Sequence, residues 1–169
     1  NQLVTALRKI ADFEISVAGY PDKHPESPNL DIDIDNLKRK IDAGATRIIT
    51  QFFFNTDSYF YFVDKCLKNG IKAQIVPGIL PVSNFKQVKH FAKMCGTKIP
   101  QWMEDLFNGL DDRQETRQII AGVVAVEMCR ILHNGGVDDF HFYTLNRSEM
   151  TTAICHILGV TEPVLLNQN

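Results

Sequence analysis

Beyond its first residue, the stretch RIITQFFF (residues 47–54) is an apolar or β-branched run that only Gln51 interrupts. Its apolar residues are consecutive instead of alternating, which is typical of a strand that helices cover on both faces. Three similar runs occur in the chain: EISVAGY (14–20), AQIVPGIL (73–80) and DFHFYTL (139–145). Loops and helical patterns separate these runs. Repeated strand–helix alternation predicts parallel βα units.

Helices are expected between these runs, and each ends at a glycine signal. Their ranges are 33–45, 56–68, 83–95 and 111–134, and a further helix is expected in LVTALRKIADF, ahead of the first strand. Ser83 is placed to cap the third of these helices. The sequence DDRQE at the start of the last one resembles a capping box. The buried face of that helix is predicted to contain Ile120, Val123, Val124, Ile131 and Leu132.

Two architectures accommodate parallel βα units. An open doubly wound sheet usually carries a glycine-rich phosphate turn after a strand, and no G-x-G-x-x-G or G-x-x-x-x-G-K-[ST] motif occurs here. A (β/α)₈ TIM barrel fits better, although a complete barrel needs about 250 residues. We therefore expect residues 1–169 to form a single domain that comprises the last four βα units of a barrel and begins in mid-fold.

Composition narrows the class of protein. A hydrophobic fraction of 44% in 169 residues is enough to bury a core. The net charge of -2 arises from 18 basic and 20 acidic residues that are mixed along the chain, so neither nucleic acid nor a membrane surface is an expected partner. Four dispersed cysteines lack metal-ligand spacing, and no stretch reaches 18 apolar residues. We expect a cytoplasmic protein without a metal site.

Polar residues gather after the first predicted strand, where barrel enzymes place their active sites. The loop YPDKHPESPNLD (20–31) contains three prolines and is longer than the usual connection of about two to six residues. On the next helix a polar arc of about 120° lies beside an apolar one. Its residues are Asp33, Asn36, Arg39 and Lys40. This arc could bind a phosphate or pyrophosphate; an ordinary solvated helix face is the alternative.

Candidate ligand-binding residues also follow the third and fourth strands. Gln87 and Phe91 are four residues apart, so they lie one above the other on a helix, where an amide and an aromatic ring suit a planar ligand. The alternative is that Phe91 belongs to the core. Arg147 comes just past the fourth strand and is placed to meet a carboxylate. His141 is interpreted as a histidine of the barrel interior.

Four segments resemble one known family. They are NLKRKIDAGATRIITQFFF (36–54), VPGILPVSNFKQ (76–87), GLDD (109–112) and DFHFYTLNR (139–147). These segments are similar to the bacterial 5,10-methylenetetrahydrofolate reductases, and the similarity extends over essentially the whole chain. The resemblance implies a (β/α)₈ barrel with FAD at its C-terminal face, of which this chain is the second half.

The resemblance also implies roles for individual residues. The flavin contacts would be Tyr20, His24, Ser27, Asp33, Asn36, Arg39 and Lys40. The substrate contacts would be Gln51 for the pterin and the nicotinamide, Gln87 for the folate, Phe91 for both substrates and Arg147 for the folate tail. Gln51 would then interrupt its apolar run because a pterin edge needs a donor and an acceptor, and an amide supplies both.

The implied reaction consists of two hydride transfers through FAD. NADH or NADPH reduces the flavin, which then reduces 5,10-methylenetetrahydrofolate to 5-methyltetrahydrofolate, a step of one-carbon metabolism and methionine synthesis. In the family, the general acid is a Glu on the first barrel strand, and an Asp after the fourth strand tunes the flavin. Neither position lies in this sequence, so no catalytic residue is assigned and the chain alone is expected to be inactive.

Two alternatives belong to other classes. The first is a non-catalytic half-barrel that self-associates to cover its open strand edges, and a homo-oligomer is expected on the same grounds. The second is a flavin-free pterin-binding barrel such as a pteroate synthase. The helix with Arg39 and Lys40 and the loop with His24 argue against this second alternative. Detection of bound flavin would distinguish a reductase of this family from both alternatives.

Overall fold

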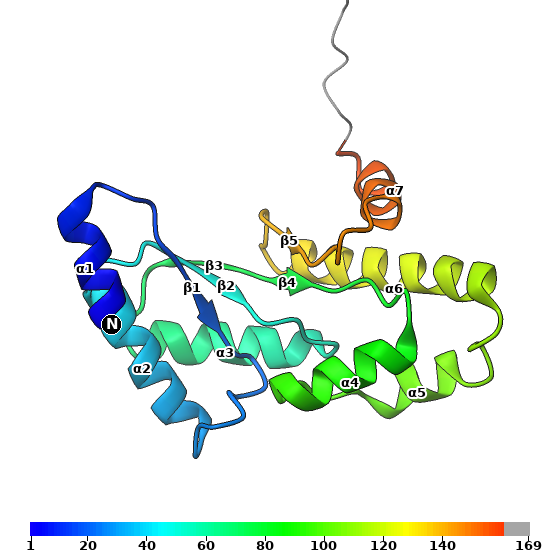
Figure 1. The fold of residues 1–169 in the computed structure, drawn as a ribbon, viewed down its shortest axis with the longest axis horizontal. Coiled ribbons are helices and arrows are strands. Elements are labelled where there is room, and N and C mark those ends of the chain that lie inside the picture. The colour runs from blue at the N-terminus through cyan, green and yellow to red at the C-terminus, as the bar shows by residue number, and fades with distance from the viewer. Residues whose placement is uncertain (161–169) are drawn as a thin grey trace, which may run out of the picture.

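A computed structural model describes residues 1–160 as helices that alternate with short parallel strands (Figure 1). The elements in chain order are α1 (Gln2–Ile10), β1 (Ser16–Gly19), α2 (Leu30–Asp42), β2 (Arg47–Thr50), α3 (Thr56–Lys68), β3 (Gln74–Val76), β4 (Gly78–Ile79), α4 (Phe85–Cys95), α5 (Gln101–Phe107), α6 (Gln114–Asn134), β5 (His141–Phe142) and α7 (Glu149–Ile157). The prediction of an α/β fold with parallel strands is confirmed. Helices α5 and α7 were not predicted.

The strands form two parallel ladders, β1-β2-β3 and β4-β5. The sequence predicted a single strand over residues 73–80, and that prediction is wrong because Pro77 divides it. Proline has no N–H to donate to a ladder. The Pro77 carbonyl instead accepts from the His141 N–H at 3.0 Å. The chain therefore changes partner at Pro77, with β3 paired to β2 and β4 paired to β5.

The other strands are shorter than predicted. β2 ends at Thr50 instead of Phe54, because the backbone of Phe52 has partners outside any ladder. Its N–H donates to the Gln51 side chain at 3.0 Å, and its carbonyl accepts from the Thr97 hydroxyl at 3.0 Å. β5 stops well before residue 145, ahead of a turn in which Leu145 has a φ of 51°.

Asparagine side chains begin four of the helices, and at α1 the Asn1 side chain accepts from the Gln2 N–H. Asn29, Asn55 and Asn84 each accept a backbone N–H of the first turn of α2, α3 and α4. Helix α2 therefore starts three residues earlier than predicted. The prediction that Ser83 caps α4 is wrong, because the cap is the next residue, Asn84. The predicted capping box of α6 is also wrong, because this helix starts at Gln114 without a side-chain cap.

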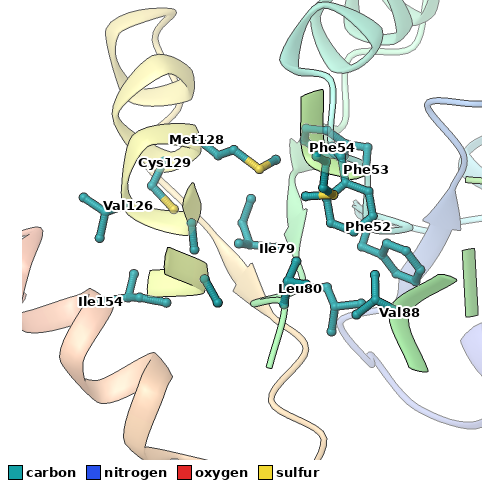
Figure 2. Packing of buried hydrophobic residues seen from close by; sticks show 14 of the residues in the cluster. Phe52, Phe53, Phe54, Ile79, Leu80, Val88, Val126, Met128, Cys129 and Ile154 are labelled. Carbon is teal, nitrogen blue, oxygen red and sulfur yellow. The ribbon is translucent and has the colours of Figure 1, made fainter. Parts of the chain in front are cut away.

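The largest core cluster lies between α6 and the segment that follows β2. Figure 2 shows Ile79 of β4 between the phenylalanines of residues 52–54 and the side chains of α6. The predicted buried face of α6 is confirmed in part: Leu132 is buried, and Ile120 and Val124 pack against this cluster. Val123 and Ile131 are wrong, since they are 64% and 42% exposed. The residues of α6 that are buried are Ala121, Ala125, Val126, Met128, Cys129 and Leu132.

A second core cluster orients α2. Ile34 and Leu37 are buried against Ile48 of β2 and Phe62 of α3. Because these apolar residues face the sheet, the adjacent polar arc of α2 points away from this core. The fold thus presents the arc beside the carboxyl end of β1.

Two further features of residues 1–160 are the length of the apolar helices and the state of the cysteines. No helix within residues 1–160 is long and apolar enough to cross a membrane. All four cysteines are free thiols. Burial raises the pKa of Cys66 and of Cys129 to about 12, so both thiols are protonated at neutral pH.

Candidate functional site

A cleft of about 420 Å³ opens at the carboxyl end of β1, between α2 and the loop that precedes it. All seven residues predicted to contact a flavin line this cleft. They are Tyr20, His24 and Ser27 from the loop and Asp33, Asn36, Arg39 and Lys40 from α2. The polar arc and the proline-containing loop therefore meet at one site, as their places after the first strand predicted.

Internal hydrogen bonds hold the loop in place. The His24 N–H donates to the Asp33 carboxylate at 2.5 Å, which ties the loop to α2. The Lys23 ammonium donates to the carbonyls of His24 at 3.1 Å and of Ser27 at 2.6 Å. Lys23 has a φ of 81°, a strained value for a residue with a side chain. Sequence patterns did not single out Lys23, because a lysine in a loop ordinarily indicates only exposure.

The hydrogen bonds also fix the tautomer of His24. The Glu26 N–H donates to Nδ1 of His24 at 3.1 Å, so Nδ1 acts as an acceptor. In the neutral ring the proton then resides on Nε2, which becomes a donor. The Tyr20 ring packs edge-on against this imidazole, with ring centroids 4.6 Å apart. The loop thus offers one oriented N–H donor to the cleft.

Tyr20 supplies a second donor. Burial raises the pKa of Tyr20 above its ordinary value, and Cys95 and Asp33 raise it further. The phenol is therefore protonated at neutral pH and can donate a hydrogen bond to a ligand in the cleft.

The cleft contains two cations, Arg39 and Lys40, and two carboxylates, Glu26 and Asp33. Arg39 and Lys40 line it, and in the part of the chain that the structure describes neither side chain forms a hydrogen bond or an ion pair with protein. The Asp33 carboxylate, by contrast, is engaged by the His24 amide. Two unpaired cations beside an imidazole N–H and a phenol match the acceptor oxygens of a phosphate or diphosphate. These residues fit the diphosphate portion of a dinucleotide cofactor.

Gln51 lies at the carboxyl end of β2 and is half-buried. Its N–H donates to the Gly19 carbonyl at 2.8 Å, and its side-chain oxygen accepts from the Phe52 N–H at 3.0 Å. Because an N–H can only donate, the atom that meets it is Oε1, and the –NH₂ group lies on the other side of the amide. The –NH₂ group is therefore free to donate to a ligand, and Oε1 keeps a second lone pair, so the expected donor–acceptor pair stays a prediction.

None of the four predicted substrate residues lines the cleft at the end of β1. Gln87 is exposed on α4, and Phe91 is half-buried against the largest core cluster. Phe91 therefore contributes to the core, which was the alternative to a ligand contact. Arg147 is exposed and lines a separate, mainly apolar groove of about 440 Å³ between α6 and α7. The structure does not bring these three residues into one pocket with Gln51.

Two further expectations concern histidine and metal. His141 is half-buried and packs edge-on against Tyr143 at 4.8 Å, in agreement with its interpretation as an interior histidine. No group of three or more His, Cys, Asp or Glu side chains within residues 1–160 is arranged to hold a metal ion.

A family model described as methylenetetrahydrofolate reductase matches residues 1–159. The chain belongs to the methylenetetrahydrofolate reductase family. The 5,10-methylenetetrahydrofolate reductase of Escherichia coli (strain K12) is 58% identical over 160 residues, which are 95% of this chain and 54% of that protein. Its counterpart in Pectobacterium carotovorum is 54% identical over 162 residues, 96% of this chain and 54% of that protein. The chain spans about half the length of the curated relatives it matches.

A solved structure has a similar fold. It is described as an uncharacterized protein from Clostridium thermocellum that binds two copies of 5-methyl-5,6,7,8-tetrahydrofolic acid. The match has a TM-score of 0.60 at 20% sequence identity and covers 93% of this chain and 58% of that chain. At this identity the likeness concerns the fold alone. The family model and the relatives, and not this fold match, confirm the resemblance of the sequence to the reductase family.

Proposed function

We propose that the complete protein is an FAD-dependent methylenetetrahydrofolate reductase that reduces 5,10-methylenetetrahydrofolate to 5-methyltetrahydrofolate with NADH or NADPH. Residues 1–169 form one domain, the last four βα units of its (β/α)₈ barrel. The observation that carries the proposal is the convergence of seven predicted flavin contacts, two of them cations without a protein partner among residues 1–160, in one cleft. Membership of the reductase family supports the choice of reaction.

The residues of the cleft bind and orient the cofactor. FAD, when bound, supplies a carrier that accepts a hydride from one substrate and donates it to the next. Arg39 and Lys40 neutralise its diphosphate, while Nε2–H of His24 and the hydroxyl of Tyr20 donate hydrogen bonds to it. The bond from His24 to Asp33 keeps the loop on α2, so these donors are oriented before the ligand arrives.

Residues that follow the later strands bind the substrates. The –NH₂ group of Gln51 donates to an acceptor on the pterin edge, and the same group serves the nicotinamide in the other half-reaction. Gln87 and Phe91 contact the folate, and Arg147 binds a carboxylate of its tail. The description of the Clostridium thermocellum protein as a binder of 5-methyltetrahydrofolic acid is consistent with a folate site on this fold.

The position of the family's general acid does not lie in this sequence, so we assign the proton donor that opens the folate ring to the other half of the complete barrel. By the same reasoning the isolated chain has no reductase activity. It self-associates instead, because β1 and β5 each have one strand partner within residues 1–160 and Val123 and Ile119 of α6 are exposed. Light scattering that finds a stable monomer of the isolated chain would contradict this part of the proposal.

Turnover by the complete protein tests the proposal. Oxidation of NADH or NADPH is followed with and without FAD and with and without 5,10-methylenetetrahydrofolate. The expected result is formation of 5-methyltetrahydrofolate that requires both FAD and a nicotinamide. Folate binding without any flavin binding would favour the pterin-binding barrel, and binding of neither would favour a non-catalytic half-barrel.

A further inference from the structure

A buried hydrogen-bond network holds the end of β2. Thr50 is fully buried, and its Oγ1 accepts from the Gly78 N–H at 2.9 Å. The Tyr143 hydroxyl donates to the Thr50 carbonyl, also at 2.9 Å. The regular ladder between β2 and β3 stops at the pair Ile49–Val76. Side-chain bonds therefore replace the ladder at Thr50, the residue directly before Gln51.

Gly78 provides the space for this arrangement. A Cβ atom at this position would overlap both the Thr50 carbonyl oxygen and the ring of Tyr143. Only glycine therefore lets the Tyr143 ring cross β4 and reach Thr50. The crossing connects residues that are 93 positions apart in the sequence.

Tyr143 also contacts the residue after Gln51. Its ring packs edge-on against Phe52, with centroids 6.4 Å apart, and the Phe52 N–H is the group that binds Oε1 of Gln51. Burial, followed by Tyr20 and Cys95, raises the pKa of Tyr143, so its hydroxyl keeps its proton at neutral pH. One side chain thus bonds the backbone before Gln51 and packs against the ring of the residue after it.

We propose that Tyr143 is a positioning residue that orients the Gln51 carboxamide toward the folate. The inference rests on the proposed role of Gln51 in folate binding. Without the Tyr143 hydroxyl, the buried Thr50 carbonyl loses a hydrogen-bond donor, and the peptide that joins it to Gln51 becomes free to tilt. The –NH₂ group of Gln51 then no longer has one fixed direction, although Tyr143 itself does not touch the ligand.

The test replaces Tyr143 by phenylalanine in the complete protein. With 5-methyltetrahydrofolate as the probe, Tyr143→Phe is expected to raise Kd by about three- to tenfold, the range that follows from losing one hydrogen bond. Hydrogen exchange of the Phe52 amide should accelerate by a similar factor, while the Val17 amide in β1 remains unchanged. Tyr59→Phe is the matched control, because the Tyr59 hydroxyl also donates to a strand carbonyl, that of Ile75, at 2.8 Å.

A double-mutant cycle separates positioning from general stability. Tyr143→Phe should have no further effect on Kd in a Gln51→Ala background, and Tyr59→Phe should lower the melting temperature without raising Kd. The proposal is overturned if Tyr143→Phe leaves Kd unchanged, raises it equally with and without Gln51, or has no more effect on it than Tyr59→Phe.

The exchange measurement keeps the two proposals apart. If the wild-type protein binds no folate, the proposed function fails. The exchange rate of the Phe52 amide then decides alone whether Tyr143 positions Gln51. Faster exchange in Tyr143→Phe supports the positioning role, and unchanged exchange overturns it.

Discussion

The backbone amide of His24 donates a hydrogen bond to the carboxylate of Asp33 at 2.5 Å, and this bond joins the loop after β1 to helix α2. The two segments carry all the predicted flavin contacts of the chain. Asp33 therefore holds the two walls of the cleft together, in addition to any contact that it makes with a ligand.

Asp33→Ala should release the loop. A hydrogen bond to a charged group contributes about 1.5–3 kcal/mol, so the His24 amide is expected to exchange with solvent roughly 10- to 100-fold faster in this variant. Asp35→Ala is the control, because Asp35 is exposed on the same helix and does not line the cleft. Amide exchange followed by mass spectrometry or NMR measures the effect. Equal protection of His24 in both variants would show that the bond does not hold the loop.

Lys40→Ala should weaken the retention of FAD. The loss of a charge-assisted hydrogen bond to the diphosphate is expected to cost about 1–3 kcal/mol of binding free energy. Lys38→Ala is a matched control, since Lys38 pairs with Asp42 at 3.4 Å and does not line the cleft. Flavin dissociation after dilution of the complete protein is the measurement. If the Lys40→Ala variant released flavin no faster than Lys38→Ala, Lys40 would be removed from the site.

Gln51→Glu tests the donor role of the carboxamide. The carboxylate can still accept from the Phe52 N–H, whereas the –NH₂ donor is lost. The folate half-reaction should therefore slow by at least about threefold, the effect of one lost hydrogen bond. Gln51→Leu removes both functions and should reduce thermal stability more than Gln51→Glu does. Stopped-flow traces of each half-reaction are compared with thermal melts. A Gln51→Ala variant with both half-reactions intact and only a lower melting temperature would make Gln51 a structural amide.

Stability should fall at high pH. Burial raises the pKa of Tyr59 to about 12 from 10.0, and the pKa of Cys66 and of Cys129 to about 12 from 9.0. The folded state therefore favours the protonated groups, so their contribution is complete below about pH 9 and is lost as the pH rises toward about 12. Urea unfolding at pH 8 and at pH 10.5 measures the change. Tyr59→Phe should show a smaller decrease than wild type, and the exposed ring of Tyr61 provides the control Tyr61→Phe. A free energy of unfolding that is the same at both pH values would contradict this prediction.

Periodicity was sufficient to predict the parallel α/β fold and the placement of the cleft residues. The burial of Ile34 and Leu37 in α2 leaves its polar arc outside the core, and both facts follow from residue spacing. Periodicity was only partly successful for α6, because this helix is apolar on several faces and exposed Val123 is as apolar as buried Ala121. Packing against α7 and the segment after β2 selects the buried face, and no local pattern records that choice.

The remaining errors concern backbone groups with unusual partners. Pro77 ends one ladder and starts another, although its flanking residues form one continuous apolar run. The backbone N–H of Phe52 donates to the side chain of Gln51 instead of to a strand, so β2 ends before the apolar run does. The bond between Tyr143 and Thr50 spans 93 positions, so sequence spacing could not predict it.

A crystal structure of the complete protein grown with FAD tests the central claim most directly. The account predicts that the cofactor occupies the cleft at the end of β1, with its diphosphate within hydrogen-bond distance of Lys40 and of Nε2 of His24. FAD bound at another surface, or a cleft that stays empty at saturating FAD, would contradict the account.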